Sequence, residues 1–130
     1  MPTSASVQLK RVKLKYFLPA ILLGAIILML SVAAGIRLPK VAIDLISPDK
    51  LAHAAAYFVF CSTLVYGWHR NGIAVSRTLW MSLTVSVAYG VLMEILQYSF
   101  FPHRYFEVWD IVANIIGSMI SVLVSYFLIK

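Results

Sequence analysis

Polar residues that can bind ligands or move protons stand at or just inside the ends of very apolar stretches of this chain. They are Asp49, Lys50, His53, Glu94, Gln97, Arg104, Asp110 and Asn114. Polar groups are costly inside a membrane and are usually kept there for function. Glu94 and His53 are residue types that general acid–base catalysis uses, and Arg104 and Lys50 could hold a phosphate or a carboxylate. We therefore treat all eight as candidate ligand-binding residues, and Glu94 and His53 as the candidate catalytic pair.

Each of these residues also has a purely structural interpretation. Asp49 and Lys50 could complement the dipole at a helix start and anchor the helix at the membrane interface. Asp110 and Asn114 could be a helix cap and a hydrogen bond between helices. Glu94 is the strongest functional candidate, because acids inside a membrane are functional by default.

Oxygen and nitrogen donors suited to a metal are also present: Asp49, His53, Glu94 and Asp110. The sequence contains no HExxH motif and no Cys/His spacing typical of a metal site. The positive charges of Lys50 and Arg104 would also repel a divalent cation nearby. Arg104 could, instead of binding a phosphate, serve only to neutralise the acids. We therefore expect no metal and no cofactor.

The composition of the 130-residue chain indicates a single membrane domain. Hydrophobic residues make up 62% of it, and the mean hydropathy of +0.89 is too high for an ordinary soluble fold. The formal charge of +6 could suggest a nucleic-acid partner. We expect none, because basic residues on so apolar a chain more often flank the cytoplasmic ends of membrane helices. The single cysteine, Cys61, excludes an intrachain disulfide.

Four long apolar runs predict an all-α fold, a four-transmembrane-helix bundle, behind a flexible basic tail. The tail covers residues 1–15 and the membrane domain covers 16–130. The predicted spans are 16–36, 49–68, 78–101 and 110–129. The first span could instead be a cleavable signal peptide ending near Ser31-Val32-Ala33. Its apolar core is long for that role, so we favour an uncleaved anchor.

Local signals set the ends of the spans and the faces that pack together. Ser47, Pro48 and Asp49 form a helix start, and Asn71-Gly72 marks a turn. Small and polar residues form one stripe on the third span and one on the fourth, and such stripes should face protein rather than acyl chains. The stripes are Ser82, Ser86, Gly90, Glu94 and Gln97, then Asp110, Asn114, Gly117, Ser118 and Ser121.

The distribution of Lys and Arg sets the predicted topology. With four spans, the tail, the 69–77 turn and the C-terminus share one side, which holds seven basic residues and no acid. The other side holds all five acids. The positive-inside rule therefore predicts that both termini are cytoplasmic and that the polar set lies at the outer face.

The polar residues also follow a family pattern in their order along the chain. The pattern is Asp49-Lys50-x-x-His53-x-x-x-Tyr57, then Glu94-x-x-Gln97, then Arg104, Asp110, Asn114 and Gly117. On four spans, this order resembles the VanZ-like family of small bacterial membrane proteins over about Ser47 to Ser121. The family's namesake is associated with lowered susceptibility to the glycopeptide antibiotic teicoplanin, without an established reaction. The resemblance implies a multi-pass protein of the bacterial cytoplasmic (inner) membrane, a role in the cell envelope and a link to antibiotic resistance.

Three functions fit these residues. In the first, the outer-face pocket binds an anionic membrane lipid or a lipid-linked envelope precursor. In the second, a membrane enzyme acts on the same class of substrate with Glu94 and His53 as acid and base. No serine or cysteine nucleophile is evident beside a base, which argues against acyl transfer. In the third, the polar cluster only locks the four helices together. We favour the first function.

The predicted topology can be tested by cysteine labelling in intact cells that carry Cys61→Ser. We expect a cysteine in the 102–109 loop to react with an impermeant thiol reagent. A cysteine in the 69–77 turn should stay unlabelled, because the basic residues hold that side in the cytoplasm. Labelling of the 69–77 site before lysis would contradict the topology, and labelling of both sites after lysis is the control.

Overall fold

The computed structural model is all-α over the residues that it describes, which are 11–33, 47–101 and 106–130. A short 3-10 turn, η1 (Leu14–Phe17), leads into α1 (Leu18–Ala33). The helices α2 (Pro48–Arg70), α3 (Val75–Phe100) and α4 (Val108–Ile129) follow. Four segments, with η1 and α1 taken as one, are long and apolar enough to span a membrane. The predicted four-helix bundle is confirmed, and these spans make the chain a multi-pass membrane protein.

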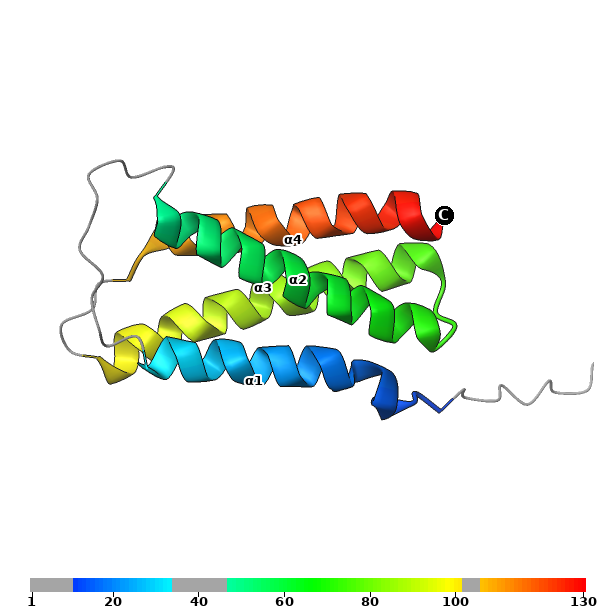
Figure 1. Cartoon of the computed structure of the whole chain (residues 1–130), viewed down its shortest axis with the longest axis horizontal. Helices are drawn as coiled ribbons and strands as arrows, with labels where there is room; N and C mark the ends of the chain where they lie inside the picture. The colour runs from blue at the N-terminus through cyan, green and yellow to red at the C-terminus, as the bar shows by residue number, and fades with distance from the viewer. Residues whose placement is uncertain (1–10, 34–46, 102–105) are drawn as a thin grey trace, which may run out of the picture.

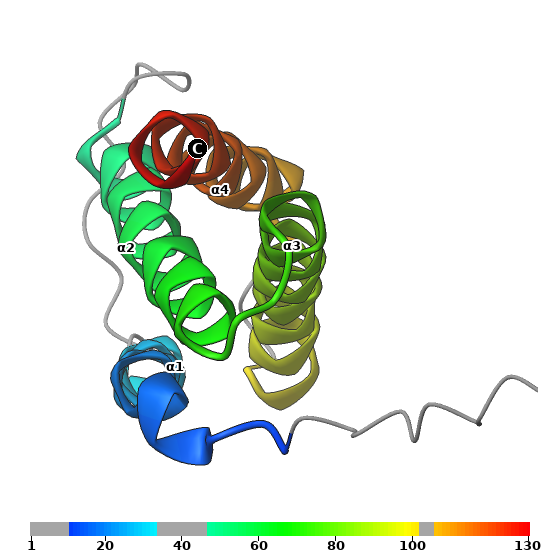
Figure 2. The ribbon, with the colours of Figure 1, turned by 90° about the vertical axis from the view of Figure 1, so that its right-hand side faces the viewer.

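The helices run side by side along the long axis of the molecule (Figure 1). α2 packs most extensively on α4, and α3 packs on both of them. α1 packs mainly on α2 and only lightly on α3, and it lies at the flank of the other three helices when the bundle is viewed end-on (Figure 2). One end of the bundle holds η1, the α2–α3 turn and the C-terminus; at the opposite end α2 and α4 begin and α3 ends (Figure 1).

The predicted signals at the ends of α2 operate as expected. The Ser47 hydroxyl accepts a hydrogen bond from the backbone N–H of Lys50 at 3.3 Å, and Pro48 takes the first helical position. After α2, Gly72 has a φ of 75°, a left-handed conformation that glycine adopts without a steric penalty. This tight turn needs few residues, so α2 runs on to Arg70 and α3 already starts at Val75.

The end of the basic tail is held against the α2–α3 turn. The backbone N–H of Lys13 donates to Asn71 Oδ1 at 2.6 Å, and the Phe17 ring packs edge-on against Trp68 at 4.7 Å between ring centroids. These contacts fix where α1 enters the bundle. Residues 1–10 of the predicted tail, residues 34–36 of the first predicted span and the 102–105 segment lie outside the described residues.

Small and polar residues line the packed faces of α3 and α4, an apolar cluster lies among α1, α2 and α3, and the outside of the bundle is apolar. Every residue of the two predicted stripes on α3 and α4 is buried. Large apolar side chains such as Leu22, Trp80 and Phe127 are exposed instead. This arrangement is the one expected in lipid, where helices gain little from burying apolar surface and associate through close packing and hydrogen bonds.

Gly117 permits the closest approach between α2 and α4, because a Cβ at this position would overlap the backbone carbonyl of Ala54. Hydroxyl pairs hold the helices together nearby. The Oγ atoms of Ser62 and Ser121 lie 2.7 Å apart, as do those of Ser86 and Ser118. The first pair joins α2 to α4 and the second joins α3 to α4, so hydrogen bonds hold both of these helices to α4.

A methyl group at position 117 should therefore separate two helices. We expect Gly117→Ala to lower the free energy of unfolding by about 1–3 kcal/mol, because a close-packed contact cannot accept an extra atom without shifting the backbone. Gly24→Ala is the matched control, since its Cβ would lie 3.4 Å from the Phe60 ring, an ordinary contact. Denaturant unfolding of the purified protein in detergent measures both changes, and equal effects would contradict the close approach.

Candidate functional site

The candidate site lies at the end of the bundle where α2 and α4 begin, which is the predicted outer end (Figure 1). The first two turns of α2 supply Asp49, Lys50 and His53, and those of α4 supply Asp110 and Asn114. The packing between α2 and α4 is the most extensive in the bundle, so these side chains meet across a close interface. The structure thus brings five of the eight sequence candidates together.

Lys50 is the centre of an ion-pair cluster. Its Nζ donates to Asp110 Oδ1, and it lies 2.8 Å from Glu107 Oε2 and 3.4 Å from Asp49 Oδ2. The Asp110 side chain is 1% exposed, whereas those of Glu107 and Asp49 are 33% and 54% exposed. Asp110 is therefore buried beneath the cluster, and Asp49 and Glu107 form its exposed edge, which we call the rim. Three carboxylates face one ammonium group, so the cluster carries excess negative charge when His53 is neutral.

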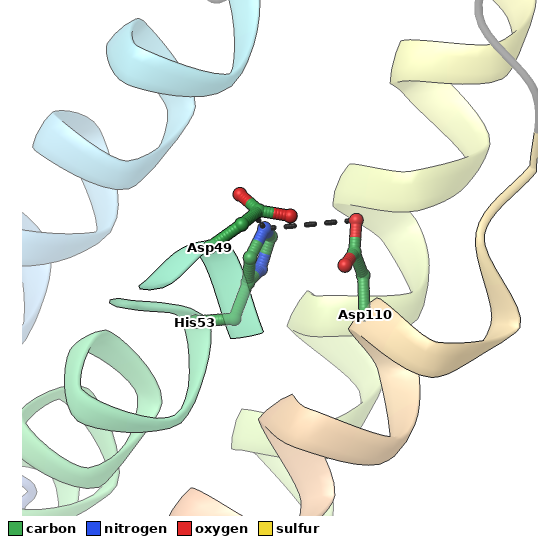
Figure 3. Close-up of side chains that lie close together, drawn as sticks. All are labelled: Asp49, His53 and Asp110. Carbon is green, nitrogen blue, oxygen red and sulfur yellow. Dashed lines mark ion pairs between the residues drawn. The ribbon is translucent and has the colours of Figure 1, made fainter. Parts of the chain in front are cut away.

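His53 is held in one orientation by Asn114. The distance from His53 Nδ1 to Asn114 Oδ1 is 3.1 Å, and since this oxygen can only accept, Nδ1 carries the hydrogen and donates it. The other ring nitrogen, Nε2, lies 3.8 Å from Asp49 Oδ1 and 3.7 Å from Asp110 Oδ2 (Figure 3). Both distances exceed the range of a hydrogen bond.

Tyr57 continues the polar interior one turn deeper than His53 on α2. It is 2% exposed, and its hydroxyl has no hydrogen-bond partner among the described residues. Gly90 lets the side chains of Tyr57 and Asn114 pack closely against α3. A Cβ on Gly90 would lie 2.9 Å from Asn114 Nδ2 and 3.2 Å from Tyr57 Cε1. Glu94, one turn along α3 from Gly90, is 2% exposed. It is thus a buried acid within a helix long and apolar enough to span a membrane.

Gln97 contacts a different part of the bundle. Its Nε2 donates to the backbone carbonyl of Ser31 at 3.3 Å, which links α3 to α1. Its Oε1 is buried without a hydrogen-bond partner in the described part of the chain. Among the sequence candidates, Gln97 is therefore the one whose hydrogen bond lies between α3 and α1 rather than between α2 and α4.

Two residues of the loop before α4 complete the comparison with the sequence prediction. Arg104 lies in the 102–105 segment, outside the described residues, so its expected role in binding phosphate stays a prediction. Glu107 was not among the candidates, yet it bonds to Lys50. It occupies the N-cap position of α4, three residues before Asp110, and an acid directly before a helix start was the available signal.

The donor atoms of the site also come close enough to share an ion. One carboxylate oxygen of Asp49, one of Asp110 and one ring nitrogen of His53 all lie within 4.8 Å of one another. Glu94, the fourth donor considered from the sequence, is not in this group. The site combines a largely buried ammonium group, two more exposed carboxylates beside it, an oriented imidazole and an excess of carboxylate oxygens.

No protein-family model, curated protein or solved structure matches the chain. The fold and the site therefore stand on the residues and their geometry.

Proposed function

We propose that this protein is a VanZ-like membrane protein of the bacterial cell envelope, which binds the anionic head of a membrane lipid or lipid-linked envelope precursor at its outer end. The observation that carries the proposal is the unequal burial of the acids around Lys50. Asp110 is 1% exposed and Glu107 is 33% exposed. A cluster that only locked α2 to α4 would be complete with the buried acid and would gain little from an accessible one, because exposed ion pairs contribute little to stability.

Glu107 acts in this proposal as a replaceable counter-ion. A phosphate or carboxylate of a ligand offers the same kind of oxygen acceptors and can take the place of Glu107 on the Lys50 ammonium. Asp110 remains beneath the lysine and keeps its Nζ at the rim. The apolar tail of the ligand lies against the exposed apolar side chains of the helices, and Arg104 supplies a second cation from the adjacent loop.

A protein that holds a lipid-linked envelope precursor changes how an antibiotic reaches that precursor. Under the proposal, the protein would contribute to glycopeptide resistance in this way. Binding at the outer face would be enough, without a chemical reaction.

A second candidate function is a membrane enzyme that acts on the same class of molecule with Glu94 and His53 as acid and base. The observation that favours it is the Asn114 amide, which fixes the ring of His53 and leaves Nε2 facing the carboxylates of Asp49 and Asp110. Turnover of a lipid-linked precursor by the purified protein, abolished by Glu94→Gln, would support this candidate over simple binding.

The binding proposal predicts opposite effects for two substitutions at the same ion pair. We expect the protein in phosphatidylcholine nanodiscs to bind a polyprenyl phosphate and to leave the matching neutral polyprenol unbound. Lys50→Met should weaken binding at least about tenfold, because a charge-assisted hydrogen bond contributes roughly 1.5–3 kcal/mol. Glu107→Gln should tighten binding severalfold, because it frees Lys50 from a competing carboxylate.

The matched control is Lys130→Met, which removes a lysine at the opposite end of the bundle and should leave binding unchanged. Equal binding of the phosphate and the neutral alcohol would contradict the proposal. So would weaker binding by Glu107→Gln, a variant that leaves the buried Lys50–Asp110 pair intact and so keeps the test independent of folding.

A further inference from the structure

Three donor atoms converge on one point at the rim of the cluster. They are His53 Nε2, Asp49 Oδ1 and Asp110 Oδ2, with the two oxygens 3.8 Å and 3.7 Å from the nitrogen (Figure 3). We infer that these atoms bind a divalent metal ion. The sequence had led us to expect none, because it holds no metal-binding motif and because Lys50 and Arg104 seemed placed to oppose a dication.

The orientation of His53 is the one that a metal ligand needs. Asn114 Oδ1 lies 3.1 Å from Nδ1, so Nε2 is the ring nitrogen that faces the two carboxylates. Histidines that bind metals commonly donate their second ring N–H to a nearby oxygen in this way, which fixes the tautomer and the ring. A divalent cation placed between Nε2 and the two facing carboxylate oxygens would be attracted by all three donor atoms.

The carboxylate oxygens are divided between Lys50 and the proposed ion. Lys50 bonds to Asp110 Oδ1 and lies 3.4 Å from Asp49 Oδ2, which are the oxygens that do not face His53. The other oxygen of each aspartate is left for the metal. Lys50 therefore orients both aspartates from the side opposite His53. The carboxylate of Glu107, 2.8 Å from the Lys50 Nζ, balances the lysine's charge. The objection that Lys50 repels a dication fails because the ammonium already has carboxylate partners of its own.

The spacing of the donors suits a small transition-metal ion. Ligand atoms about 2.0–2.2 Å from Zn²⁺ lie roughly 3–3.5 Å apart at tetrahedral angles, so a small inward rotation of the side chains completes the site. An imidazole ligand favours Zn²⁺ over Ca²⁺, Mg²⁺ and Mn²⁺. Asp49 is 54% exposed and His53 is 21% exposed, so the fourth coordination position opens toward the end of the bundle. Three protein ligands and one open position are typical of sites that bind a substrate oxygen.

Metal binding stands on these residues alone, but one consequence rests on the proposed function. A dication in this position offsets the excess negative charge of the cluster. Its open coordination position can then accept an oxygen of the ligand phosphate that Lys50 holds. Phosphate and metal would share the rim, with Lys50 and the ion on two sides of the same group.

The test uses the full chain in detergent after removal of metals with a chelator, and calorimetric titration with Zn²⁺. We expect one ion per chain with micromolar or tighter affinity. Asp49→Asn and His53→Ala should each weaken binding at least about tenfold, and Asn114→Ala should weaken it less, as expected for a residue that positions a ligand. His69→Ala, at the opposite end of α2, is the control and should bind like the wild type. Asp49 is half exposed, so its substitution leaves the fold intact.

Absence of Zn²⁺ binding, or equal binding by Asp49→Asn, overturns the inference. A second measurement separates the metal from a proton in the same position. We expect the nitrogen NMR signal of His53 Nε2 to shift on addition of Zn²⁺; an imidazolium signal that persists with Zn²⁺ present shows that a proton, not a metal, lies between the acids. Polyprenyl phosphate binding with and without chelator tests the shared site separately. Zn²⁺ binding without lipid binding would contradict the proposed function and leave the metal site standing.

Discussion

The end of the bundle where α2 and α4 begin depends on one largely buried charge pair, between Lys50 at the start of α2 and Asp110 at the start of α4. Removing two charges from water costs several kcal/mol for each ion, and the pair repays this only when the remaining hydrogen-bonding positions are also filled. Asp49 and Glu107 fill those of the lysine from the rim. Because the pair joins the first turns of two helices, it also sets the level at which His53 meets Asn114.

The charge pair can form only because the helices behind it approach closely. Gly117 brings the backbone of α4 against Ala54 of α2, and the hydroxyls of Ser62 and Ser121 hold the two helices one turn further on. In lipid, such close contacts and hydrogen bonds hold helices together alongside the apolar cluster of the interior. The small and polar faces of α2 and α4 thus position the charge cluster, and the apolar exterior suits a lipid environment.

The sequence was sufficient for the elements and for their buried faces. Hydropathy alone located four spans, Ser47-Pro48 located the start of α2, and the helical spacing of small residues located the faces of α3 and α4. Pairing between particular side chains was harder to foresee. Gln97 bonds to Ser31 of α1, and spacing within α3 holds no information on which neighbour each turn will meet.

The sequence could not show which oxygen atom of each aspartate contacts Lys50 and which one faces His53. Lys50 was judged to repel a dication on its charge alone. Its effect depends on which oxygen of Asp49 and Asp110 it engages, and that follows from how α2 and α4 cross. Glu107 was missed for a related reason, because the direction of a side chain in a loop is set by how the next helix begins.

The central claim is that Lys50 and Asp110 stabilise the bundle as a pair, and a double-mutant cycle measures this directly. Lys50→Met and Asp110→Asn would be made singly and together, and the free energy of unfolding measured in detergent. Lys50→Met should cost about 3–5 kcal/mol, because it leaves the buried Asp110 carboxylate without its lysine, and Asp110→Asn should cost less, because Lys50 keeps Glu107 at 2.8 Å. The double change should cost at least about 2 kcal/mol less than the sum of the two single costs. Costs that add to within about 0.5 kcal/mol would show that the two residues act independently and would contradict the account.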